Sequence, residues 1–369
     1  TLTVLSAGGL KLRRQIEVVA PPRVLASLDL IGLDGRISPS RVVFGMQWPA
    51  GGTPRFDAHG PLQVSGFVLT GPPEVSSGAG AVECEEFIWK GPEDFSGRFR
   101  LSGGSAMVAG VRVQEAEALV TLEPTLIRVS EFHARALDGR IFTDFPAESA
   151  REPGEITLGL AGHAAVRATF GFDGFRLERM GEELGFRGPL AGRLDGMVDV
   201  RSADPSPIHY LGTTQLNISE GVLGTVPVLS QIWSLLGVQT PVFREGRLAM
   251  RFLGEGRILV EQLALNHALL EVTGERMITM DSYLGLKVTV RSFGFLGRLP
   301  LVRDVLDFIV EQDVYGPASA PRLRQRGFGK LFEGDPPKVP FPLWVPNVPP
   351  PDRDRSPVLP SERVLAPRS

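Results

Sequence analysis

The sequence predicts an all-β protein, mainly antiparallel, on three observations. Apolar and polar residues alternate with a period of two over many short segments, which is typical of strands with one buried and one hydrated face. Asp-Gly and Glu-Gly pairs, which favour tight turns, lie between such segments. No long helical stretch separates the segments, which favours an antiparallel meander of hairpins over a βαβ arrangement.

The alternation is clearest at residues 194–201, 247–252 and 284–291. In the last two, the apolar positions are Leu248, Met250, Phe252, Leu284, Leu286, Val288 and Val290. The positions of opposite parity, which we expect to face water, are Arg247, Arg251, Lys287, Thr289 and Arg291. Further strands are predicted at 15–19, 25–30, 41–47, 62–69, 81–89, 97–101, 118–122, 126–132, 156–160, 166–170 and 214–218. Tight turns are predicted at 33–36, 137–140, 219–221 and 254–256.

Two segments interrupt the alternation with a helical period. Each follows a Leu-Gly-x-x-Pro sequence, and the spacing predicts short amphipathic helices near 227–236 and 300–312. Their apolar stripes are Leu229, Ile232, Trp233 and Leu236, and Val302, Val305, Leu306 and Ile309. The shared form indicates an internal repeat of helix-bearing hairpins. We expect the helices to cover apolar sheet surface, the alternative being that they gate a groove.

The last part of the chain, 333–369, has a different composition. From Pro336 to Ser369 it holds 11 prolines, including Pro349-Pro350-Pro351, and no hydrophobic period. Such a segment is expected to be extended and not to join a core.

Composition and motifs argue against several functional classes. The net charge is −3, with 39 Lys+Arg against 42 Asp+Glu, so nucleic acid is not an expected partner. The phosphate-loop, dinucleotide-binding, zincin and nucleophile-elbow motifs are absent from the sequence. His133, near Glu131 and Asp138, is expected to be a solvent-facing strand residue, and acidic neighbours should raise the pKa of the Cys84 thiol. The sequence therefore predicts no enzyme, no metal and no cofactor. It also shows no signal peptide and no apolar stretch long enough to span a membrane.

Residues 213–312 resemble a known family. The run TTQLNISEGVLGTVPVLSQIWSLLGVQ, the strands REGRLAMRFLGEGRILVEQLALNHALLEVTGERMITMDSYLGLKVTVR and the segment LGRLPLVRDVLDFIVEQ are similar in pattern and order to the C-terminal region of AsmA-like proteins, the group of TamB and YhdP. Gly274-Glu275-Arg276 stands where the family usually has a Gly-x-Gly turn, and its second glycine is missing. Weaker similarity continues upstream at 126–145 and 190–200.

The resemblance implies a fold, a function and a location. The fold would be an elongated, twisted β-sheet shaped as an apolar groove: an N-terminal β-repeat region (1–109), an AsmA-like groove region (110–332) and the Pro-rich tail. The function would be a non-enzymatic part of a conduit that moves phospholipid between inner and outer membrane and supports outer-membrane assembly. The protein would be periplasmic and anchored to the inner membrane by a segment upstream of this chain. Its partners would be acyl chains, lying on the seven apolar residues of 248–252 and 284–290, and envelope proteins contacting the tail.

The same alternation is compatible with another function. Apolar faces that meet each other build a closed β-sandwich. The alternative is therefore a closed β-repeat surface or adhesin-type binding module without a lipid groove.

Overall fold

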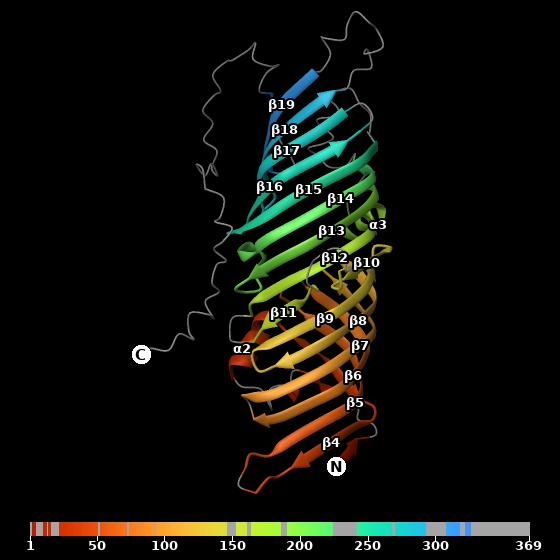
Figure 1. Ribbon diagram of the computed structural model, residues 1–369, viewed down its shortest axis with the longest axis vertical. Coiled ribbons are helices and arrows are strands. Elements are labelled where there is room, and N and C mark those ends of the chain that lie inside the picture. Colours follow the sequence, from red (N-terminus) through yellow and green to blue (C-terminus); the bar gives the residue numbers. More distant parts are fainter. Residues whose placement is uncertain are drawn as a thin grey trace, which may run out of the picture. The chain divides into compact units, whose positions relative to one another are not determined.

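The computed structural model describes residues 2–325, apart from 5–9, 13, 16–21, 51, 72–73, 92, 146–152, 161–163, 186–189, 224–241, 268–269, 293–307 and 318–321. The chain divides into two units, Thr1–Arg326 and Gly327–Ser369, so the predicted tail lies outside the described residues. All described strands of the first unit join one 20-stranded sheet, and the pairings between them are antiparallel. The predicted fold class, an elongated and mainly antiparallel all-β sheet, is confirmed (Figure 1).

At the N-terminal end of the sheet, two short strands together occupy the position next to β5. Both β3 and β4 pair with β5, β4 along its first part and β3 along its second, so they lie end to end. The outermost strands β1 and β2 pair with β4 and β3. The bounds are β1 Leu2–Val4, β2 Leu10–Lys11, β3 Asp34–Pro39, β4 Val42–Gln47 and β5 Arg55–Leu69.

A long meander follows, with one more break. Short strands β10 and β11 lie end to end between β9 and β12, and each pairs with both. At this break, residues 143–145 after β10 and 153–155 before β11 lie outside the strands. The sheet runs through the predicted boundary at residue 109 without interruption, because β7 pairs with β8. The bounds are β6 Val75–Gly91, β7 Asp94–Val108, β8 Val111–Glu123, β9 Leu126–Ala136, β10 Gly139–Phe142, β11 Ile156–Gly159 and β12 Val166–Arg176.

The remaining strands pair strictly in sequence order, from β12–β13 to β19–β20. Their bounds are β13 Leu190–Ser202, β14 Leu211–Leu223, β15 Val242–Gly254, β16 Arg257–Asn266, β17 Leu270–Thr279, β18 Tyr283–Ser292, β19 Phe308–Pro317 and β20 Arg322–Gln325. Consecutive antiparallel pairing is the arrangement that the short predicted turns require.

The two helices that the structure describes, α2 (Pro22–Ile31) and α3 (Leu177–Leu184), lie elsewhere than predicted. The prediction of a strand at 25–30 is wrong. Pro22 is tolerated in a first helical turn, and Val24, Leu28 and Ile31, all buried, recur at helical spacing. A short 3₁₀ helix, Pro207–His209, precedes β14.

The helix predicted near 300–312 is wrong at its end. Phe308 to Gln312 belong to β19, which pairs over ten residues with β18. Gln312 and Val314, two residues apart, are both buried, as expected for one face of a strand. Because Gln312 is polar, the sequence does not show the apolar alternation that would predict this strand. Hydrogen bonding to β18 outweighs the helical spacing of this short stretch. Val302, Val305 and Leu306 lie outside the described residues, and so does the helix predicted near 227–236 with its whole apolar stripe.

Candidate functional site

The sheet has one apolar and one polar face. A hydrophobic cluster on the apolar face extends from β12 to β19, and its buried members include Phe172, Leu194, Phe243, Leu265 and Val314. Charged side chains of the opposite parity form ion pairs, for example Lys287 with Glu311 at 3.5 Å and Arg291 with Glu271 at 4.0 Å. The side chains predicted to face water therefore lie on the polar face.

The structure places the two predicted sets of lining residues on the same face. Leu248 of β15 is a cross-strand neighbour of Leu263, which neighbours Gly274, which neighbours Val288 of β18. This row crosses four strands. The apolar positions of residues 248–252 and 284–290 therefore belong to one continuous surface.

The two sets differ in burial. Val288 and Val290 are 1% and 2% exposed and are part of the cluster, against which Leu284 and Leu286 pack. Leu248, Met250 and Phe252 are half-buried, and so are Leu284 and Leu286. The set on β18 therefore includes two closed positions, Val288 and Val290, whereas all three positions on β15 remain partly accessible.

Helix α2 connects the two opposite sides of the sheet at which the strands end. Backbone N–H groups of Thr70 and Gly71, after the end of β5, donate to the Ile31 carbonyl at 3.0 Å each. At the other edge, Val24 and Leu28 belong to one cluster with Leu160 and Ala164, which follow β11. Figure 1 shows α2, coloured red, beside β11.

This bridge requires the sheet to curl around its apolar face. Leu122, which packs on the α2 cluster, lies in one cross-strand row with Ala58 of β5. Leu69, which packs on the same cluster, is about 36 Å further along a flat β5 at 3.3 Å per residue. A ten-residue helix is only about 15 Å long. The ends of β5 and β11 can both contact this short helix only if the apolar face is concave.

Helix α3 covers part of the same face. Its Leu177 and Met180 pack into the clusters that contain Val113 of β8 and Leu194 of β13. The Glu183 carboxylate accepts a hydrogen bond from the Arg112 backbone N–H at 2.7 Å. The helix therefore ties strands of the meander that are not neighbours, on their apolar side.

The apolar face is exposed where the sheet begins. Phe44, Met46 and Trp48 alternate along and beyond β4 and are 41%, 56% and 69% exposed, and Phe56 of β5 is 37% exposed. Met46 is the cross-strand neighbour of Phe56, which neighbours Trp89 of β6 with ring centroids 5.3 Å apart. We call these five side chains the aromatic end. They continue the apolar face, because Phe56 and Ala58 share parity with Leu62 and Val64.

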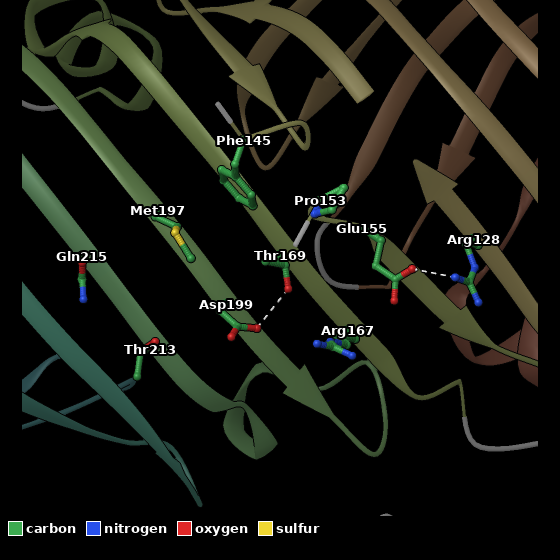
Figure 2. A pocket seen from close by; sticks show the side chains of 10 residues that line it. All are labelled: Arg128, Phe145, Pro153, Glu155, Arg167, Thr169, Met197, Asp199, Thr213 and Gln215. Atoms are coloured by element: carbon green, nitrogen blue, oxygen red, sulfur yellow. Dashed lines mark hydrogen bonds and ion pairs between the residues drawn. The ribbon is translucent and has the colours of Figure 1, made fainter. Parts of the chain in front are cut away.

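A cleft of about 660 Å³ lies on the polar face, beside the break between β10 and β11 (Figure 2). Its floor carries an ion pair, Arg128 to Glu155 at 3.0 Å, and a hydrogen bond donated by the Thr169 hydroxyl to Asp199 at 3.0 Å. Phe145 and Pro153, from the segment between β10 and β11, line the cleft together with Arg167, Met197, Thr213 and Gln215.

The structure places the two candidate chemical residues found in the sequence, Cys84 and His133, on different strands, β6 and β9. His133 is half exposed and its Nε2 lies 3.0 Å from Asp144, whereas Glu131 pairs with Arg100 and Asp138 with Arg179. Burial, and secondly the charge of Glu83, raises the pKa of the Cys84 thiol to about 11, so it is protonated at neutral pH. In the described ranges, no group of three His, Cys, Asp or Glu could hold a metal ion, and no helix is long and apolar enough to cross a membrane.

Sequence reasoning missed α2, the aromatic end and the cleft. The first two have sequence signals: Val24, Leu28 and Ile31 at helical spacing after Pro22, and the alternation of Phe44, Met46 and Trp48. The cleft has none, because its residues come from four strands, β9, β12, β13 and β14, and from the segment between β10 and β11.

Comparisons with protein-family models, curated proteins and solved structures found no match.

Proposed function

We propose that this chain is a non-enzymatic envelope protein whose apolar face forms part of a conduit for phospholipid between inner and outer membrane, in support of outer-membrane assembly. The observation that carries the proposal is the aromatic end. Large apolar side chains of the concave face remain exposed there, up to 69% for Trp48. In a closed domain these side chains would be its core.

The surface suits acyl chains without specific chemistry. Burying an acyl chain yields about 0.8 kcal/mol for each methylene, so a continuous apolar row such as Leu248–Leu263–Gly274–Val288 can hold lipid by contact alone. Helices α2 and α3 lie on the same face and cover part of its apolar surface. The half-buried lining positions are the ones open to a ligand: Leu248, Met250, Phe252, Leu284 and Leu286.

The cellular setting rests on the resemblance to AsmA-like proteins. We propose a periplasmic location, an inner-membrane anchor carried by a segment upstream of Thr1, and contacts between the Pro-rich tail and other envelope proteins. These partners would deliver and receive lipid at the two ends of the sheet.

A closed binding module is the second candidate function. The near-complete burial of Val272, Val288, Val290 and Val314 favours it, because these positions are already packed in a core. Under this hypothesis, a surface such as the polar cleft would bind the partner, and the apolar face would only stabilise the fold.

Native mass spectrometry of the purified chain tests the proposal. We expect co-purified phospholipid on the parent protein and a clear loss of it in Trp48→Asp. The exposure of Trp48 lets the fold tolerate a carboxylate. Gln47→Asp is the matched control, because the neighbouring residue has the opposite parity and is also exposed. A parent protein free of lipid, or equal lipid loss in both variants, would favour the closed module.

A further inference from the structure

A row of basic side chains crosses the polar face. Six residues on six strands are successive cross-strand neighbours: Arg98, Thr121, Arg128, Thr157, Arg167 and Arg201, on β7, β8, β9, β11, β12 and β13. We call them the arginine row. Neighbouring strands are about 4.8 Å apart, so the row is about 24 Å wide.

The arginines of this row differ in their partners. Arg98 pairs with Glu85 and Arg128 with Glu155, both at 3.0 Å. Arg167 and Arg201 are directly opposite each other in the β12–β13 pairing, and neither has a hydrogen bond or ion pair with the described residues. Like charges at directly opposed positions destabilise a sheet. The pair therefore costs free energy unless an anion lies between the two guanidinium groups.

The arginine row borders the polar cleft. Arg128 and Arg167 line the cleft (Figure 2), and Thr157 stands between them in the row. A guanidinium group presents a planar fork of donors that matches phosphate oxygens, and a hydroxyl adds another donor. Because Arg128 is already paired with Glu155, the donors left for a ligand at this rim are those of Arg167, its neighbour Arg201 and the Thr157 hydroxyl, beside a volume large enough for a small ligand.

The rest of the cleft is suited to uncharged polar groups. Beyond the row, Asp199, Thr213 and Gln215 offer acceptors and donors. The carboxylates of Glu155 and Asp199 would repel a second anionic group there. A ligand that fits both parts has one phosphoryl group and several hydroxyls.

We propose that the arginine row and the adjoining cleft bind a phosphorylated polyol, with its phosphoryl group held by Arg167, Arg201 and Thr157. The polyol is either a free sugar phosphate or the headgroup of a phospholipid. Because the site lies on the polar face, it does not depend on the proposed lipid conduit on the apolar face.

Titration calorimetry on the full chain at low ionic strength tests this site. We expect saturable binding of glucose 6-phosphate and at least tenfold weaker binding of glucose. Arg167→Gln and Arg201→Gln should each weaken the affinity tenfold or more. Arg247→Gln is the matched control: Arg247 is exposed on the polar face of β15, has no ion pair in the described part of the chain, and lies outside the row. This variant should bind as the parent does.

A vesicle assay distinguishes the two sources of the phosphoryl group. Co-sedimentation with phosphatidylglycerol vesicles, lost in Arg167→Gln but not in Arg247→Gln, would assign the site to a lipid headgroup even if glucose 6-phosphate does not bind. The proposal fails if neither probe binds, if glucose binds as well as its phosphate, or if Arg247→Gln weakens binding as much. Without ligand, Arg167→Gln should melt at or above the parent temperature. A lower melting temperature would contradict the repulsive pair.

Discussion

At the scale of the residue, Arg276 shows the cost of a missing glycine. It has a φ of +109° in the middle of β17, a conformation that side chains other than glycine rarely adopt. Its side chain points toward Asp313 at 4.0 Å, an ion pair in which the arginine is largely exposed and which contributes little.

We predict that Arg276→Gly stabilises the protein by about 1 kcal/mol, because it relieves this backbone strain. Urea unfolding measures the effect. Arg247→Gly is the control, an exposed arginine within β15 whose φ is not positive, and it should destabilise by about 0.5–1 kcal/mol. If Arg276→Gly is as destabilising as the control, the strain is not real.

The pH dependence of Cys84 is a second prediction at this scale. The pKa of its thiol is raised from 9.0 to about 11 because burial, and then Glu83, disfavours the thiolate. The thiolate is the reactive form, so native Cys84 should remain resistant to iodoacetamide at pH 9, where an unfolded thiol is half ionised. Mass spectrometry with and without denaturant measures the two rates, and similar rates would contradict the burial.

Residue parity is what the sequence predicted best. Alternation assigned Leu248 and Val288 to one face and Lys287 and Arg291 to the other, and the cross-strand pairings and ion pairs agree. Parity does not predict burial, since Val288 is buried and Leu248 half-buried on the same face. Burial depends on what covers the sheet, which local alternation does not encode.

At the scale of the element, α2 is the helix that contacts the ends of both β5 and β11. We predict that Leu28→Ala destabilises the protein by about 2–5 kcal/mol, because Leu28 is 3% exposed and its loss leaves a cavity. Leu30→Ala, in the same helix but at a residue 52% exposed, is the matched control and should change stability by less than about 0.5 kcal/mol. Equal effects of the two substitutions in chemical denaturation would show that α2 does not pack as described.

Turn chemistry was predicted with mixed success. The hairpins at 137–140 and 254–256 are present, with positive φ at Asp138 and Glu255. At 219–221 the same type of sequence lies inside β14, where Glu220 has a φ of +53°. A β-bulge uses the same backbone conformations as a tight turn. Local sequence therefore indicates a positive φ without showing whether the chain reverses there.

At the scale of the whole sheet, the antiparallel order followed from the short connections, but its curvature did not. The concave apolar face depends on α2 meeting the ends of β5 and β11, two segments far apart in the sequence. The cleft likewise depends on four strands and on the break between β10 and β11. The local alternation of apolar and polar residues does not encode contacts between segments that are far apart in the sequence.

The central claim is that lipid lies along one continuous face, from the aromatic end to β15. Photo-crosslinking in the presence of phospholipid vesicles tests it most directly, with the crosslinker at Met46 and at Met250. The controls are Gln47 and Arg247, which have the opposite parity on the same two segments. We predict phospholipid adducts from 46 and 250 and none from 47 and 247. Adducts from all four positions, or only protein adducts from 250, would contradict a continuous lipid-bearing face.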